Sequence, residues 1–299
     1  MVVTPRDAAT VMLVRDVARP PGVEVCMLRR NLASEFVAGA YVFPGGSLDP
    51  ADRSSEAIAL CRGRSDEQAS SLLGVDECGL AFWVAALREC FEESGVLVGR
   101  HQDGSGPGEL LDTSDPETAA RFERRRRALI EGHTTLPEIC HDEGLVLAAD
   151  EMYYVSHWIT PEVSPRRYDT RFFITAAPLG QTARHDAGET IATDWVRPEE
   201  ALERHAALET VLLPPTVANL TSIAGCTSTD EVMAWASGVT EVQTILPIVL
   251  FEDGNLVILR PGDSGYEEAR ADLDATGAQL DPDLGEATRT VWGPELGIV

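Results

Sequence analysis

The sequence contains no lysine, and arginine supplies all 24 of its basic side chains. A Walker A phosphate-binding loop, a Schiff-base enzyme and a pyridoxal phosphate enzyme each require a lysine, so these three classes are excluded. Cysteine is scarce as well, and the six cysteines form no CxxC pair. We therefore expect reduced, mostly buried thiols, as in a cytoplasmic protein, and do not expect a zinc site.

The sequence also has no long hydrophobic runs and few positively charged residues. No run reaches the roughly 18 apolar residues of a membrane span, and the N-terminal apolar run meets an acid too soon for a signal peptide. The 49 acidic residues give a formal charge of −25, which repels nucleic acid and anionic membranes at long range. We expect a cytoplasmic protein with a small-molecule substrate and no nucleic-acid or membrane partner, and the sequence leaves a homodimer open.

Short apolar runs between turn residues predict strands over residues 9–14, 23–28, 153–159, 171–176 and 191–196. Helical patterns and capping residues predict helices over residues 53–79, 79–94, 116–131, 198–208 and 229–237. Residues 39–46 are an apolar segment that ends in a Pro-Gly-Gly turn. Segments 245–251 and 256–259 flank an Asp-Gly dipeptide, which is the favoured turn of a β-hairpin.

The most informative stretch is residues 88–96, Arg-Glu-Cys-Phe-Glu-Glu-Ser-Gly-Val. On a helix, Glu89, Glu92 and Glu93 stand at i, i+3 and i+4 and therefore share one face. Gly95 stands where a helix commonly ends. Such an acidic cluster, taken alone, is typical of a solvated face. The functional alternative is that a divalent cation supplies the missing countercharge, because hard oxygen ligands suit Mg²⁺ or Mn²⁺.

Residues 88–96 resemble the second half of the Nudix box. The first half of that box, a glycine, five residues and an acid, resembles the segment from Gly46 to Asp52, with Asp in place of Glu. Gly46 lies 42 positions before Arg88, so the box carries an insertion of about 28 residues. A split box resembles the coenzyme A diphosphatase-like branch of the family, and so do the runs at residues 43–46, 166–175, 185–190 and 212–216.

This resemblance implies a Nudix-type α/β/α sandwich with a mixed sheet, helical insertions at about residues 53–79 and 100–150, and a C-terminal extension. We expect the Nudix hydrolase domain to cover residues 1–240, and the extension with its β-hairpin to cover residues 241–299. The implied activity is metal-dependent hydrolysis of the diphosphate bond of a nucleoside diphosphate linked to another group, with coenzyme A or acyl-CoA as first candidate. NADH, ADP-ribose or a nucleotide sugar is the alternative substrate. A non-catalytic nucleotide-binding Nudix module is the alternative of another class.

The resemblance also implies roles for particular residues. The metal ligands for Mg²⁺ or Mn²⁺ would be Gly46, Glu89, Glu92 and Glu93, with Glu92 and Glu93 as the main ones. Glu89, or the loop acid Glu189, would take the proton from the attacking water. Arg88 completes the implied catalytic set, and we expect it to brace a carboxylate or a loop through a bidentate pair.

Substrate-binding candidates come from the segment before the box. Arg30 and Phe43 match part of the coenzyme A signature, and we expect both at the substrate. Asn31 and Glu35 depart from that signature, which expects Ser or Ala and a second Arg at these positions.

Two further sets of arginines have alternative interpretations. Arg171, on a predicted strand, either holds a substrate phosphate or pairs with Asp169 or another acid. The four arginines at residues 124–127 are typical of a solvated helix face. Their functional alternative is a clamp on the phosphates of the substrate.

Overall fold

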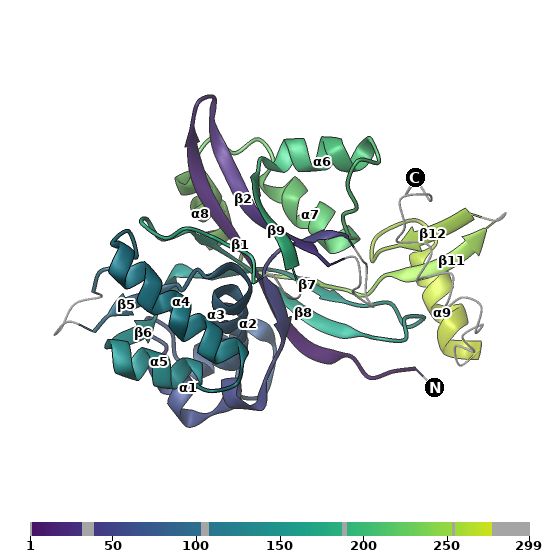
Figure 1. The fold of residues 1–299 in the computed structure, drawn as a ribbon. Coiled ribbons are helices and arrows are strands. Elements are labelled where there is room, and N and C mark those ends of the chain that lie inside the picture. Colours follow the sequence, from purple (N-terminus) through teal and green to yellow (C-terminus); the bar gives the residue numbers. More distant parts are fainter. Residues whose placement is uncertain (1, 32–38, 103–107, 187–189, 253–254, 277–299) are drawn as a thin grey trace.

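The computed structural model describes residues 2–31, 39–102, 108–186, 190–252 and 255–276. The strands of its main sheet are β1 (Arg6–Ala18), β2 (Pro21–Arg30), β3 (Tyr41–Val42), β4 (Gly45–Ser47), β7 (Tyr153–Ile159), β8 (Tyr168–Ala176), β9 (Thr190–Val196) and β10 (Thr244–Ile245). Within the described residues their order is β10-β7-β8-β1-β2-β3, with β4 paired to β1 and β9 to β2 (Figure 1). The sheet is mixed, because β1 is parallel to β8 and antiparallel to β2 and β4.

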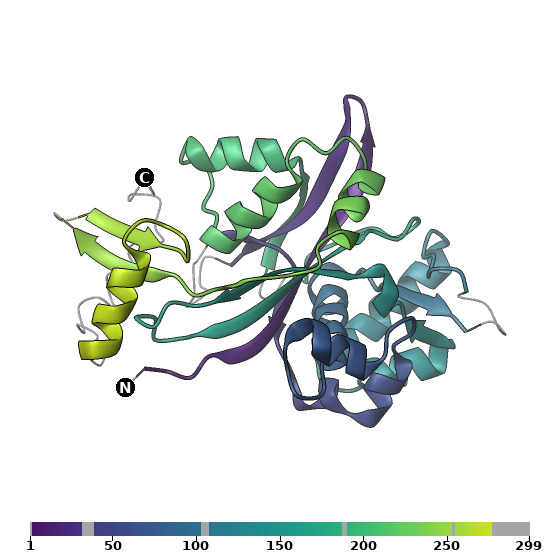
Figure 2. The ribbon, with the colours of Figure 1, turned by 180° about the vertical axis from the view of Figure 1, so that it is seen from behind.

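Helices cover both faces of this sheet (Figures 1 and 2). One layer holds α1 (Ser55–Leu60), α2 (Asp66–Leu73), α3 (Leu80–Ser94), α4 (Pro116–Ile130) and α5 (Leu136–Glu143), and the other holds α6 (Pro198–Ala206), α7 (Pro214–Ile223) and α8 (Thr229–Ser237). Each helical layer forms a hydrophobic core with one face of the sheet. Successive side chains of β1 point to opposite faces, so that Val11 and Leu13 pack into one core and Met12 and Val14 into the other. The predicted α/β/α sandwich is confirmed.

Helix α3 carries the acidic cluster and is built as a core helix. Residues 80–87 are all buried, so its first two turns are apolar all round. Polar side chains enter only from Arg88 onward. Gly95 ends the helix with a left-handed φ of 74°, and its N–H donates to the carbonyl oxygen of Phe91 at 2.9 Å. The predicted glycine stop at Gly95 is confirmed.

The single helix predicted over residues 53–79 is wrong, because this segment forms α1 and α2 after a short 3₁₀ turn at Pro50–Arg53. Helix α1 ends at Cys61, whose backbone forms an isolated parallel β-bridge with Leu147. The N–H of Arg62 donates to the carbonyl oxygen of Leu147 at 3.0 Å. Ser65 then caps α2 by accepting from the N–H of Gln68. A backbone contact with a residue distant in sequence therefore splits the segment that the local pattern predicts as one continuous helix.

Residues 100–150 include α4 and α5. In sequence these helices lie between β5 (Gly99–His101) and β6 (Leu145–Leu147), which pair with each other as a separate two-stranded sheet. Helix α4 confirms the prediction over residues 116–131, whereas α5 was not predicted. None of the described helices is both long and apolar enough to cross a membrane.

The C-terminal unit consists of a β-hairpin and one helix. Strands β11 (Ile248–Glu252) and β12 (Asn255–Leu259) pair antiparallel, as the sequence predicts. The Asp-Gly turn at residues 253–254 lies outside the described residues. Helix α9 (Tyr266–Thr276) follows, and the unit lies beyond the ends of β7 and β8 (Figure 1).

Candidate active site

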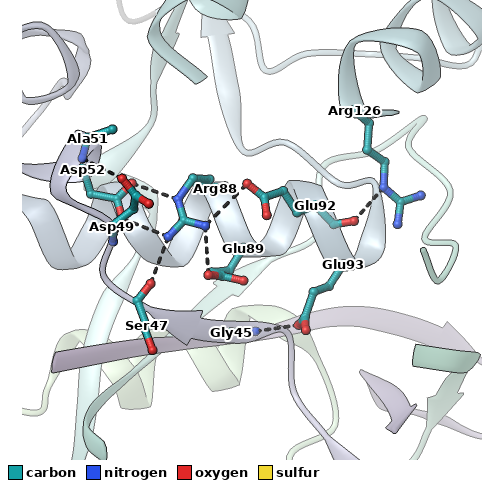
Figure 3. A network of polar contacts seen from close by, with 10 residues as sticks. All are labelled: Gly45, Ser47, Asp49, Ala51, Asp52, Arg88, Glu89, Glu92, Glu93 and Arg126. Atoms are coloured by element: carbon teal, nitrogen blue, oxygen red, sulfur yellow. Dashed lines mark hydrogen bonds and ion pairs between the residues drawn. The ribbon is translucent and has the colours of Figure 1, made fainter. Parts of the chain in front are cut away.

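Arg88 lies at the centre of a polar network beside β4 (Figure 3). Its Nε and Nη2 donate to the two carboxylate oxygens of Asp52, both at 2.9 Å. Nη2 also donates to the carbonyl oxygen of Ser47 at 3.0 Å. Nη1 donates to Oε1 of Glu89 at 2.8 Å and lies 3.4 Å from Oε1 of Glu92. The bidentate pair expected of Arg88 is present, and Asp52 is its partner.

Asp52 is 2% exposed and is itself held in place. Its Oδ2 accepts a hydrogen bond from the N–H of Asp49 at 2.7 Å, which closes a capping box over the 3₁₀ turn. The acid at the end of the first half of the box therefore links this turn to α3. A side-chain pair reconnects the two halves that the insertion separates in sequence.

Strand β4 lies directly against the acidic face of α3 at Gly45 and Gly46. A Cβ atom on Gly46 would stand 2.5 Å from Oε1 of Glu89, a separation that real side chains do not adopt. The backbone N–H of Gly45 donates to Oε2 of Glu93 at 2.9 Å (Figure 3). The glycine turn and the acidic helix face therefore meet, and a side chain at position 46 would displace the carboxylate of Glu89 from its present position.

These groups open into a cavity of about 830 Å³. The three acids Glu89, Glu92 and Glu93 line it, together with Gly45 and Gly46. The predicted substrate residues Arg30 and Phe43 line it as well. Arg88 is not among the lining residues, and its guanidinium instead contacts Asp52, Ser47 and the acids that line the cavity.

Burial is the main electrostatic effect in the cluster. It raises the pKa of Glu89 to about 7, against the lowering effect of Arg88 and with a further raise from Glu92. Burial also raises the pKa of Glu92. For Arg88, burial lowers the pKa, but the hydrogen bonds with Asp52 and the charges of the neighbouring glutamates outweigh it and raise the pKa overall. Three carboxylates, those of Asp52, Glu89 and Glu92, thus share this guanidinium, so that three negative charges face one positive charge.

The donor set of this cluster fits a hard divalent cation, since it consists of carboxylate and backbone oxygens. Among the described residues, no three His, Cys, Asp or Glu side chains already converge on one point. Glu89 and Glu92 turn toward Arg88, and Glu93 turns toward Gly45. The residues therefore have the chemistry of a divalent-cation site, and Arg88 and the N–H of Gly45 are among their present partners.

The prediction that Arg171 holds a substrate phosphate is wrong. Its neighbours Thr170 and Phe172 line the cavity, and because side chains alternate along β8, Arg171 faces the other way. Its Nη1 lies 2.8 Å from Oδ1 of Asp169, and its guanidinium lies 4.5 Å from the ring centroid of Phe82. The structural alternative, a pair with Asp169, is the one observed.

The arginine run on α4 is solvated only in part. Arg127 is exposed, as predicted, but Arg126 is 3% exposed and donates from Nε to the carbonyl oxygen of Glu92 at 2.8 Å (Figure 3). It thereby pairs with one of the carbonyls that the end of α3 leaves without a helical partner. The sequence does hold a signal for this, because Phe122, Arg126 and Leu129 follow the spacing of a buried helix face.

Glu189, the alternative base, lies outside the described residues. Asp186 of the same loop lines the cavity, and its Oδ1 accepts from the N–H and Oγ1 of Thr190 at 3.0 and 2.6 Å. The sequence did not single out Asp186, nor the aromatic lining residues Trp158 and Phe172. These side chains become neighbours only through strand pairing.

Comparison with known proteins agrees with this geometry. The sequence model of the NUDT19 Nudix domain matches residues 72–223, just over half of the chain. The chain belongs to the Nudix family. The resemblance to its coenzyme A diphosphatase-like branch is thereby confirmed, and the protein is a Nudix hydrolase.

Similar Nudix proteins cover most of the chain. The chain is 30% identical to Acyl-coenzyme A diphosphatase NUDT19 of Gallus gallus, over 91% of this chain and 82% of that protein. It is 28% identical to the protein of the same name from Homo sapiens, over 84% of this chain and 75% of that protein. A crystal structure of a NUDIX hydrolase from Alicyclobacillus acidocaldarius superposes with a TM-score of 0.60 at 26% identity, covering 78% of this chain and 97% of that one.

Proposed function

We propose that this Nudix hydrolase cleaves the diphosphate bond of coenzyme A or an acyl-CoA. The products are phosphopantetheine, acylated when the thioester is present, and adenosine 3′,5′-bisphosphate. The observation that carries the proposal is the placement of Glu89, Glu92 and Glu93 on one wall of a single cavity beside Gly46. The two relatives named as acyl-coenzyme A diphosphatases support the choice of substrate.

The cation we propose is Mg²⁺ or Mn²⁺, held by the carboxylates of Glu89, Glu92 and Glu93 and the carbonyl of Gly46. The crowding of acids in a buried site supports this, because burial raises the pKa of Glu89 and Glu92 and a cation there would favour their charged forms. When bound, such a cation neutralises charge on the diphosphate and makes a water molecule more acidic.

The chain's own residues then supply positioning and proton transfer. Glu89 lines the cavity beside Gly46 and takes the proton from the attacking water. The water oxygen forms a bond to one phosphorus, and the bond from that phosphorus to the bridging oxygen breaks. The Arg88–Asp52 pair keeps Glu89 and Glu92 aimed at the cavity. Glu189 is the alternative base.

A substrate panel tests this proposal. The protein is incubated with Mn²⁺ or Mg²⁺ and with coenzyme A, an acyl-CoA, NADH, ADP-ribose or a nucleotide sugar, and the released products are quantified by chromatography. We expect the coenzyme A compounds to give the highest kcat/KM and excess EDTA to abolish turnover. A higher kcat/KM for NADH or ADP-ribose contradicts the substrate, and unchanged turnover in EDTA contradicts the cation.

Glu93→Gln separates catalysis from binding in the same assay. Glu93 is 6% exposed and lies against the N–H of Gly45, so the substitution preserves shape while removing the charge. We expect turnover to fall by about 100-fold or more, with binding of the substrate retained. A non-catalytic module would show binding but no turnover in the wild-type protein.

A further inference from the structure

The cavity runs away from the acidic cluster across one face of the sheet. At the level of Ala8, β4 pairs with β1, β1 with β8, and β8 with β7. With neighbouring strands about 4.8 Å apart, β7 lies roughly 14 Å from β4. Phe172 of β8 and Trp158 of β7 line the cavity along this path. Its floor therefore leads from the carboxylates to an aromatic region near the sheet edge.

The far end of the cavity is lined by the C-terminal unit. Pro247, just after β10, and Ile258, on β12, both line it. The match to the Nudix domain covers residues 72–223, so this wall comes from outside the matched segment. Ile159 and Pro161 from the end of β7 line the same cavity. The end opposite the acids thus combines these aliphatic side chains with Thr160, Arg166 and Tyr168 from the same strand ends.

Three contacts join the C-terminal unit to the sheet. Strand β10 continues the sheet by pairing parallel with β7, Ile245 opposite Trp158. The hydroxyl of Tyr266, a buried residue of α9, donates to the carbonyl oxygen of Leu246 at 2.9 Å. Arg270 of α9 forms an ion pair of 3.2 Å with Glu162 in the β7–β8 connection. The wall is therefore attached to the same strands that form the cavity floor.

We propose that the far end of the cavity receives the acyl group of a thioester substrate, so that the C-terminal unit determines which acyl chains the enzyme accepts. This inference rests on the proposed function. The pantetheine arm has about a dozen bonds between the diphosphate and the sulfur, and an extended amide chain of that length spans roughly 14 Å. A diphosphate at Glu89 and Glu93 then places the sulfur beside β7 and the acyl chain against Pro247 and Ile258.

The chemistry of the far wall favours a methylene chain over the adenine ring. Aliphatic surface gains free energy from burying methylene groups, whereas the polar edges of adenine lose their hydration unless they find partners. Arg166 also lines this cavity. Placement of the nucleotide half at the far end is therefore the competing arrangement that the experiment has to distinguish.

The test measures kcat/KM for a series from acetyl-CoA to hexadecanoyl-CoA with Mn²⁺. In the wild type, each methylene that reaches the wall should raise kcat/KM about two- to fourfold. Ile258→Trp should lower the ratio of kcat/KM for dodecanoyl-CoA over acetyl-CoA at least tenfold. Ile258→Ala should shift the preferred chain to greater length. Leu179→Trp, at a site that is 92% exposed and outside the cavity lining, is the matched control and should leave the ratio unchanged.

The outcomes separate this inference from the proposed function. If the wild-type protein hydrolyses no coenzyme A compound, the proposed function fails, and calorimetric binding of S-dodecanoyl pantetheine still tests the acyl site. Weaker binding to Ile258→Trp than to wild type supports the site, and equal or absent binding to both overturns it. An equal fall in kcat/KM for every substrate of Ile258→Trp, ADP-ribose included, also overturns it. Melting temperatures show whether each variant folds. If Ile258→Trp does not fold, the chain-length preference of Ile258→Ala decides the test.

Discussion

Ionisation of Glu89 should make the stability of the metal-free protein depend on pH. Burial raises the pKa of this carboxyl from its ordinary 4.5 to about 7, and the side chain is 15% exposed. The folded protein therefore holds a proton that the unfolded chain has lost between these two values. The stabilisation from holding it is fully present below 4.5 and is lost as the pH rises to about 7. At about 1.4 kcal/mol for each pKa unit, the full loss amounts to about 3–4 kcal/mol, of which about 2–3 kcal/mol falls between pH 5 and pH 8.

Urea unfolding in EDTA at pH 5 and pH 8 measures this loss. Other acids also titrate, so the quantity to compare is the pH-dependent change in the free energy of unfolding between wild type and Glu89→Gln. The wild type should lose about 2–3 kcal/mol more than the variant over this range. Glu203→Gln, on the exposed side of α6, is the control and should behave as wild type. Identical pH dependence of wild type and Glu89→Gln would refute the reasoning.

Asp52→Asn removes the bidentate charged partner of Arg88 and leaves this guanidinium with the carboxylates of Glu89 and Glu92, so we expect a loss of about 1–3 kcal/mol in urea unfolding together with a lower kcat. Arg126→Met removes the donor that pairs with the carbonyl of Glu92 at the end of α3. We expect the apparent Kd for Mn²⁺, measured by titrating activity with the metal, to rise several-fold. Arg171→Met breaks the pair with Asp169 on the face of β8 away from the cavity, so we expect a lower melting temperature with KM unchanged.

The elements that the sequence predicts well are those whose information is local. The apolar run of β1 and the glycine stop at Gly95 are both visible in a few consecutive residues. The acidic face of α3 follows in the same way from the i, i+3, i+4 spacing. The break between α1 and α2 was missed, because it depends on a contact of Cys61 with the distant residue Leu147.

The site residues that the sequence misjudged depend on which face of an element meets the cavity. Arg171 belongs to a strand with polar residues on one face and cavity-lining residues on the other, and periodicity alone does not say which face binds substrate. Arg126 sits in a run of four arginines whose charge suggests a solvated face, yet packing turns this one inward. Trp158 reaches the cavity through the order of the strands, and Ile258 reaches it from a separate two-stranded sheet; the local pattern contains neither arrangement.

The insertion in the Nudix box can be understood from the burial of α3. A helix that is apolar all round needs cover on every side, and the sheet covers one side of residues 80–87. The inserted helices α1 and α2, with α4 and α5, complete the same hydrophobic core that contains Trp83 and Leu87. The insertion does not separate the catalytic groups, because the Arg88–Asp52 pair closes the box through side chains. The extra residues thus bury the inner part of the helix and leave its last two turns open to the cavity.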